Sequence, residues 1–273
     1  MSEDKKNDGK SLTRRMAYGG PVKLEGFNNL TKSLSFNLYD FCVARDDYER
    51  ECYVKYIHEQ YNADKISRIL KGICNIIDAQ VIADSSQDYD PWGASSLILM
   101  SDYISDDKLF QRPLGGSSSV AHLDKSHICA HTYPDFRGNG TICSFRIDID
   151  ISTCGEISPL RALNYMFDAF ESDVVVIDYV VRGYTRDSLG RRVYRDHDLT
   201  SIQDYIDKKI LTDYYCVDLA LQSDNIWQTK MLRTKLNEQS YFLNQADLTD
   251  AANRSYLEKV KKEMRGILYM WPE

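Results

Sequence analysis

The sequence predicts an α+β protein, a sandwich in which a mainly antiparallel sheet is covered by helices on one face. Residues 145–151 alternate Phe and three Ile with Arg and two Asp, the pattern of a strand with one buried face. The predicted strands follow one another across short turns, and the predicted helices come in blocks. We expect a single domain at 22–273, preceded at 1–21 by a disordered extension rich in Lys, Asp, Ser and Gly.

Strands are predicted where apolar and polar residues alternate, or where short apolar runs end at turn residues. The turn Asp187-Ser-Leu-Gly190 predicts a hairpin between its two flanking strands. Pro113, Gly115 and Gly116 predict a polar loop at 106–119. The predicted strands are 34–39, 80–83, 95–101, 120–124, 127–133, 145–151, 173–184, 191–195 and 214–221.

Helices are predicted from the spacing of apolar residues and from their start signals. At 63–77, six Ile and Leu residues fall on one helical face. Ser158 followed by Pro159 predicts a helix start, with Ser as the N-cap and Pro in the first turn. The predicted helices are 46–61, 63–77, 159–171, 201–210 and 249–269.

Bulk properties exclude several classes of protein. A net charge of −7 is unfavourable for nucleic-acid binding, which needs a basic stripe. The seven cysteines include no CxxC pair, so the sequence does not predict a zinc ribbon. The chain shows no apolar signal segment and no apolar run of about 18 residues. We therefore expect a cytoplasmic protein with reduced thiols and no membrane partner.

Reactive side chains are concentrated in His122-Leu-Asp-Lys-Ser-His-Ile-Cys-Ala-His-Thr-Tyr-Pro134, which holds three of the five His of the chain. A serine at a tight turn can attack its own preceding carbonyl and form an ester. Removal of its α-proton then breaks the chain and leaves a pyruvoyl group. Other interpretations stay open. His127, Cys129 and His131 share one strand face, which can be merely polar. With Cys154 or Asp148 they can bind zinc, and a Cys–His dyad is a further candidate.

The same segment resembles the processing motif of bacterial S-adenosylmethionine decarboxylase, in its longer proteobacterial type, where Lys-Ser is the scissile pair. The resemblance extends over about residues 24–270. Further stretches that resemble the family are Gly26-Phe-Asn-Asn-Leu-Thr-Lys-Ser-Leu-Ser-Phe36, Ser152-Thr-Cys-Gly155, Ile157-Ser-Pro-Leu160, Ala162-Leu-Asn-Tyr165, Glu171-Ser-Asp173, Ile177-Asp-Tyr179 and Val181-Arg-Gly183.

The resemblance implies a role for four residues. Cleavage between Lys125 and Ser126 gives a β chain of 1–125 and an α chain of 126–273, with Ser126 becoming the pyruvoyl group that forms a Schiff base with the substrate. His131 is implied as the proton acceptor in this processing, and Cys154 as the proton donor in catalysis. A thiol is chemically suited to that role as a neutral acid near pH 7.

The resemblance also implies partners and cofactors. The substrate is S-adenosylmethionine, and the product is the decarboxylated aminopropyl donor for spermidine biosynthesis. The protein is a homo-oligomer of αβ units, with protomer sheets packed as αββα. Mg²⁺ is an implied activator for which the sequence indicates no ligands. Two alternatives stay open: a pyruvoyl-dependent decarboxylase of arginine or ornithine, and an unprocessed protein that binds metal through the His and Cys face.

Overall fold

The protein is described by a computed structural model that covers residues 29–102, 126–136 and 140–271. The expected extension at 1–21, the expected loop at 106–119, the expected strand at 120–124 and Lys125 all lie outside the described residues.

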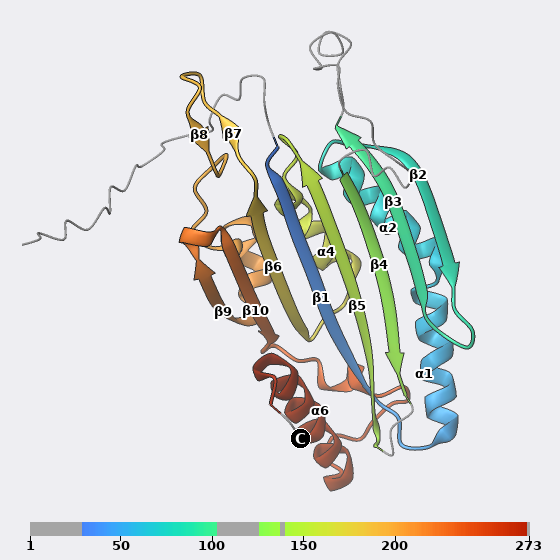
Figure 1. The fold of residues 1–273 in the computed structure, drawn as a ribbon. Helices are drawn as coiled ribbons and strands as arrows, with labels where there is room; N and C mark the ends of the chain where they lie inside the picture. Colours follow the sequence, from blue (N-terminus) through green and yellow to red (C-terminus); the bar gives the residue numbers. More distant parts are fainter. Residues whose placement is uncertain (1–28, 103–125, 137–139, 272–273) are drawn as a thin grey trace, which may run out of the picture.

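An eight-stranded sheet forms the centre of the molecule, and each of its neighbouring strand pairs is antiparallel (Figure 1). The predicted α+β class with an antiparallel sheet is thereby confirmed. Its strands, in spatial order, are β2 (Ala79–Asp88), β3 (Ala94–Asp102), β4 (Ser126–Asp135), β5 (Ile142–Cys154), β1 (Thr31–Val43), β6 (Val174–Arg182), β10 (Ile226–Arg233) and β9 (Tyr214–Leu221).

One face of the sheet, the covered face, packs against α1 (Asp47–Gln60), α2 (Ala63–Ile76) and α4 (Leu163–Ala169), which lie behind the sheet in Figure 1. The strands send alternate apolar residues to this face, because side chains in a strand point to opposite sides in turn. Phe36, at the middle of β1, is fully buried there and meets the Phe167 ring edge-on, with centroids 5.4 Å apart. The covered face therefore holds the main hydrophobic core.

The opposite face, the open face, carries the polar residues of β1, β4 and β5. The predicted cover of helices on one face holds for α1, α2 and α4, and one further helix lies on the open face. The last helix, α6 (Ala251–Tyr269), packs across the lower end of the open face, where Phe41 and Val43 join its apolar residues in a second core. Lys230 of β10 also donates to the carbonyl of Leu268 at 3.3 Å. Among the described residues, no helix covers the upper part of this face.

Several local predictions need correction. The helix expected at 159–171 is a 3₁₀ turn (Pro159–Ala162) followed by α4, and the Ser158 hydroxyl makes no capping bond among the described residues. The helix expected at 201–210 is a 3₁₀ turn (Ile202–Tyr205) and the single-turn α5 (Lys208–Leu211).

The expected hairpin around residues 187–190 exists only as β7 (Thr185–Arg186) and β8 (Arg192–Val193), because most of the strand before it, β6, pairs with β1 and β10 instead. Strand β10 was not predicted. Its inward positions include the polar Thr229 beside Trp227 and Met231, and this weakens the alternation.

Candidate active site

Ser126 is the first residue of β4 and is fully buried on the covered face. Its Oγ accepts a hydrogen bond from the backbone N–H of Cys154, with 3.2 Å between the two atoms. These two residues are 28 positions apart in the sequence, and the antiparallel pairing of β4 with β5 brings them together. The structure thus unites the predicted cleavage serine with the predicted thiol acid.

Cys154 is the last residue of β5, and its half-buried side chain has the parity of the open face. Its Sγ lies 3.7 Å from Oγ1 of Thr31, the residue directly opposite on β1. The chain turns at once after Cys154, because Gly155 adopts a φ of +73°, a conformation that favours glycine. The Gly155 N–H then donates to the carbonyl of Leu30 at 3.1 Å.

His131 does not lie beside Ser126 in this arrangement. It is five residues further along β4, about 16 Å away at the usual rise per residue, and it faces Asp148 of β5 and Ser95 of β3. The two side chains also point to opposite faces, because five is an odd number of steps. His131 and its neighbours His127 and Cys129 share the open face, as the parity of the sequence predicts.

A polar groove of about 350 Å³ runs over the open face near these residues. Its walls come from four adjacent strands, β4, β5, β1 and β6, so the groove exists only because the sheet is assembled in this order. It ends at Arg182, which is paired with Thr31. Its polar lining residues are Ser33, Ser35, His127, Asp150, Ser152, Asp178 and Arg182.

A buried ion pair anchors the same end of the sheet. Lys32 lies on the covered face, in one row with Thr153 of β5, and is fully buried. Its ammonium pairs with Asp196, whose other carboxylate oxygen lies 2.7 Å from Nδ1 of His197. Burial raises the pKa of Asp196, but the hydrogen bond with His197 and the charge of Lys32 outweigh burial and bring that pKa to about 2.

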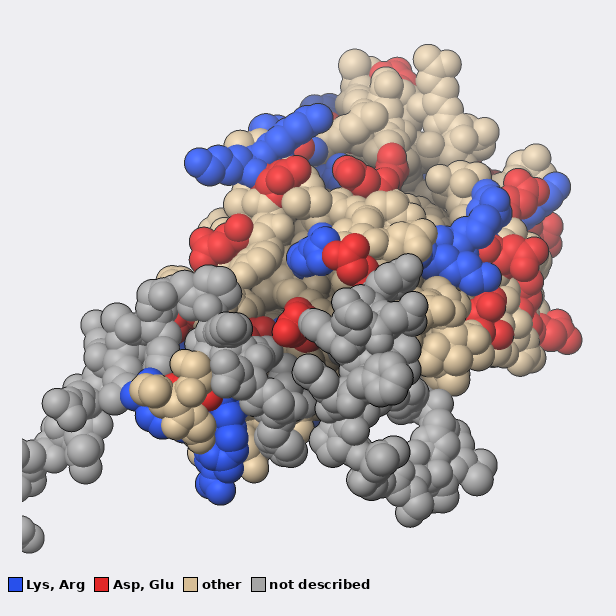
Figure 2. Space-filling view, turned by 90° about the horizontal axis from the view of Figure 1, so that it is seen from above, with Lys and Arg blue, Asp and Glu red and all other residues tan. Residues whose placement is uncertain are grey.

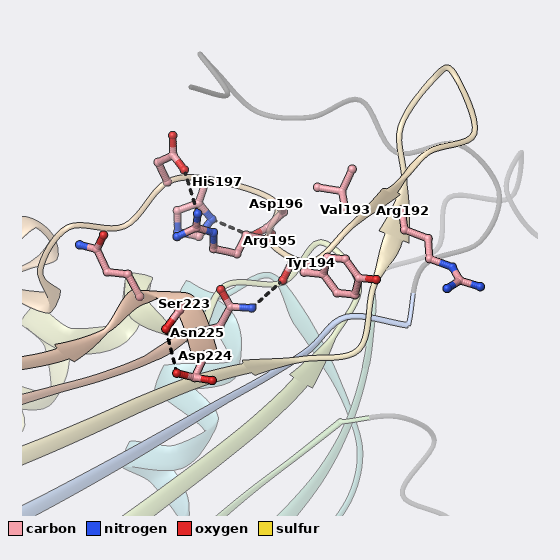
Figure 3. A pocket seen from close by; sticks show the side chains of 11 residues that line it. Arg192, Val193, Tyr194, Arg195, Asp196, His197, Ser223, Asp224 and Asn225 are labelled. Carbon is pink, nitrogen blue, oxygen red and sulfur yellow. Dashed lines mark hydrogen bonds and ion pairs between the residues drawn. The ribbon is translucent and has the colours of Figure 1, made fainter. Parts of the chain in front are cut away.

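Figure 3 shows Asp196 and His197 in a pocket of about 370 Å³ formed by the segment after β8 and by the turn before β10. In that turn Asn225 donates from its side-chain amide to the carbonyl of Tyr194 at 3.2 Å, which holds the two segments together.

None of Thr31, Lys32, Asp196 and His197 was among the candidates from the sequence. One signal was available for Lys32. Lys32 has the same strand parity as the apolar residues Leu34 and Phe36, so its charged side chain falls at a position expected to face the core.

A second group of buried carboxyls lies far from this site. Burial and the neighbouring Asp173 raise the pKa of Asp40 well above its usual range. The Tyr241 hydroxyl donates to Asp173 at 2.7 Å in a cavity of about 370 Å³. Asp40 is nine residues along β1 from Thr31, about 30 Å away, so this pair lies near the opposite end of β1 from the residues around Ser126.

A bound metal ion needs side chains that converge on it with a defined ligand geometry. Within the described ranges, no three side chains of His, Cys, Asp or Glu converge on a point that could hold a metal ion. His127, Cys129 and His131 follow each other at two-residue steps along β4, so they form a line rather than a cage. No helix of the described chain is long and apolar enough to cross a membrane.

Seen from above, acidic and basic side chains are interspersed on the described surface (Figure 2), with no basic stripe in this view. All seven cysteines lie within the described ranges, and none forms a disulfide.

Comparison with known proteins gives consistent matches. A family model described as S-adenosylmethionine decarboxylase matches residues 51–183. The S-adenosylmethionine decarboxylase proenzyme of Photorhabdus laumondii is 46% identical over 255 residues, which cover 91% of this chain and 96% of the relative. The proenzyme of Clostridium acetobutylicum is 45% identical over 256 residues, covering 91% and 93%.

A crystal structure of the adenosylmethionine decarboxylase from Aquifex aeolicus matches 64% of this chain and 100% of that chain, at 16% identity and a TM-score of 0.32.

The ion pair of Lys32 and Asp196 predicts a specific acid sensitivity. Because the pKa of Asp196 is lowered to about 2, its stabilising effect is complete above the unfolded value of about 4 and is lost as the pH falls toward 2. Asp196→Asn leaves Lys32 without its counter-charge, so we expect a loss of about 3–5 kcal/mol at pH 7 and a flatter decline between pH 4 and 2. Urea unfolding at pH 7 and from pH 4 to 2 measures the free energy of unfolding and its pH dependence, with Asp224→Asn as the control. If the free energy of unfolding has the same pH dependence in Asp196→Asn as in the unchanged chain, this account is wrong.

Proposed function

This chain belongs to the S-adenosylmethionine decarboxylase family, and we propose that it is a proenzyme that cleaves itself between Lys125 and Ser126. As a decarboxylase it removes CO₂ from S-adenosylmethionine and yields the aminopropyl donor for spermidine synthesis. The observation that carries the proposal is the hydrogen bond from the Cys154 N–H to Oγ of Ser126, which joins the two residues that the chemistry requires.

The proposed cleavage begins at the Ser126 hydroxyl. Its oxygen attacks the carbonyl carbon of Lys125, the peptide nitrogen leaves, and an ester links the two residues. Removal of the Ser126 α-proton then expels the Lys125 carboxylate, and hydrolysis of the remaining enamine releases ammonia. The Cys154 N–H occupies one lone pair of Oγ, so it restricts the rotation of the hydroxyl before the attack. The products are chains of 125 and 148 residues.

The residues around Ser126 fit a pyruvoyl group at the new chain start, with Cys154 beside it. The group supplies an electron sink for the bond to CO₂. Cys154 supplies the proton that replaces CO₂ on the substrate carbon. This role is supported by the position of Cys154 on the open face, one row beyond the groove lined by His127 and Ser152, where we propose that the substrate binds.

The role proposed for His131 requires a second chain. Cβ of Ser126 points to the covered face, so its α-hydrogen tilts toward the open face, which also carries His131. About 16 Å separates the two residues within one chain, far beyond hydrogen-bond distance. We propose that protomers pair through their open faces, as αββα, and that His131 of one protomer serves Ser126 of the other.

The family assignment favours S-adenosylmethionine over arginine or ornithine as the substrate, because relatives of this identity cover nearly the whole chain. The unprocessed metal-binding alternative has no converging ligands in the described ranges. For the same reason, the described residues offer no fit for the Mg²⁺ activator, and no step is assigned to it. We place the enzyme in the cytoplasm, where its thiols stay reduced.

Self-cleavage predicts two chains in any active preparation. Denaturing mass spectrometry should find the 125- and 148-residue products, the larger one with a blocked start. Ser126→Ala removes the nucleophile and should stay intact and inactive. Cys154→Ala should be cleaved at least in part yet turn over poorly, because it lacks only the proton donor. An active preparation that contains a single uncleaved chain would refute the mechanism.

Pairing of protomers predicts complementation between two inactive variants. His131→Ala alone should stall as the ester, which hydroxylamine cleaves. Co-expressed with Ser126→Ala, which supplies an intact His131 but cannot cleave itself, the His131→Ala chain should be processed. Tags of different mass tell the two chains apart. If neither chain is cleaved in the mixture, His131 does not act across protomers, and His127→Ala then tests the nearest histidine in the same chain.

The substrate is tested by release of ¹⁴CO₂. The processed enzyme should release label from carboxyl-labelled S-adenosylmethionine and not from labelled arginine or ornithine. Ser126→Ala serves as the blank. Release from one of the two amino acids without release from S-adenosylmethionine would replace the proposed substrate.

A further inference from the structure

We propose that Thr31 is the positioning residue of the proton donor: its hydroxyl donates a hydrogen bond to Sγ of Cys154 and leaves the thiol proton directed at the substrate. The inference rests on the proposed role of Cys154 and adds a second residue to it. It also assigns the start of β1 a part in the chemistry.

The contact follows from the register of the two strands. Thr31 and Cys154 are directly opposite each other in the antiparallel pair of β1 and β5, and both side chains take the open face. Opposed residues have Cβ atoms about 5 Å apart, so a hydroxyl and a thiol can meet with little adjustment. The 3.7 Å between Oγ1 and Sγ is a normal length for a hydrogen bond to sulfur, whose atomic radius is larger than that of oxygen.

Thr31 is held in place from both sides along the chain. The residue before it, Leu30, accepts from the Gly155 N–H at 3.1 Å, and Asn29 donates to the Tyr184 carbonyl at 3.2 Å. The residue after it, Lys32, is fully buried and paired with Asp196, which Figure 3 shows next to His197. Threonine is also stiff at χ1. Its hydroxyl is therefore fixed before any substrate arrives.

A further restraint acts on the same end of β1. Gly183, at the end of β6, has a φ of +81°, and a Cβ there would overlap the Asn29 carbonyl oxygen. Only glycine therefore fits at position 183, where the end of β6 meets the start of β1.

The direction of the hydrogen bond follows from what the thiol must do. When the Sγ–H bond breaks, the proton joins the substrate carbon and takes the electron pair left by CO₂. Sulfur keeps the electron pair of its own bond as a thiolate, which water later reprotonates. A bond from the Thr31 hydroxyl is stronger to thiolate than to thiol, because charge-assisted hydrogen bonds are the stronger kind. Donation from Thr31 therefore stabilises sulfur as the proton departs.

Three other side chains that can carry a positive charge lie on the same strands. Arg182 of β6 is opposite Thr31, His127 of β4 is opposite Ser152, and Lys32 lies on the other face of β1. All three are unchanged when only Thr31 is replaced. Thr31→Val removes the hydroxyl and keeps the shape and strand preference of the side chain, whereas Thr31→Ser keeps the hydroxyl.

The test measures the thiol without the cleavage reaction. In a Ser126→Ala background, iodoacetamide labelling of Cys154 is followed by peptide mass spectrometry from pH 6 to 10, with Cys129 in the same chain as the internal reference. Thr31→Val should slow labelling of Cys154 at pH 7 about tenfold, because the thiolate loses a charge-assisted hydrogen bond. Cys129 should be unaffected, and Thr31→Ser should restore the original profile.

A second measurement uses the processed enzyme. Misplaced protonation, on the pyruvoyl group instead of the substrate, inactivates the enzyme, so Thr31→Val should complete several-fold fewer turnovers before inactivation while still being cleaved at Ser126. Thr212→Val, on the exposed surface, is the matched control. Thr31→Ala serves as a second hydroxyl-free variant if Thr31→Val does not fold.

The outcomes separate the two proposals. A Cys154 labelling profile that Thr31→Val leaves unchanged overturns the role of Thr31, whatever the activity. A shifted labelling profile, together with a Ser126-containing chain that is never cleaved, supports the contact and overturns only the proposed self-processing.

Discussion

The antiparallel register that joins β4, β5 and β1 brings Ser126, Cys154 and Thr31 together. A slip of one residue would move Ser126 to the open face or Cys154 to the covered face, because side chains alternate along a strand. The register is specified by the apolar residues of the covered face, such as Ile128, Ile151 and Leu34, which are buried there. The packing of the hydrophobic core therefore also fixes the geometry of the site.

The site lies where two strands of that sheet end or begin. Ser126 is the first residue of β4, and Cys154 ends β5 at a glycine turn, where the chain leaves the strand. Rigidity comes instead from the start of β1, which is hydrogen-bonded to the segments after β5 and β6.

The buried Lys32 is costly to stability by itself, because a buried charge must be compensated. Asp196 compensates it and is in turn held by His197, so the segment after β8 is fixed over the covered face at the same end of the sheet as Ser126. Replacing such a pair by apolar residues is often neutral or stabilising in proteins. Its presence beside Thr31 is consistent with a selection for position rather than for stability.

The sequence by itself determined the fold class and most of the strands and helices, because the alternation of apolar and polar residues is a local property of the chain. Its resemblance to a known family implied the roles of Ser126 and Cys154. The sequence also placed His127, Cys129 and His131 on one face. It did not reveal that His131 lies about 16 Å from Ser126, with its side chain on the other face of the sheet. The motif implies a role for His131 but does not show that both residues belong to the same extended strand.

Nor did the sequence reveal Thr31 opposite Cys154, Asp196 beside Lys32, or α6 on the open face. These contacts join residues more than 100 positions apart in the first two cases, and strand order and register decide them. Only the tertiary structure sets the strand order and the register, because both result from the packing of the whole core and not from any one segment.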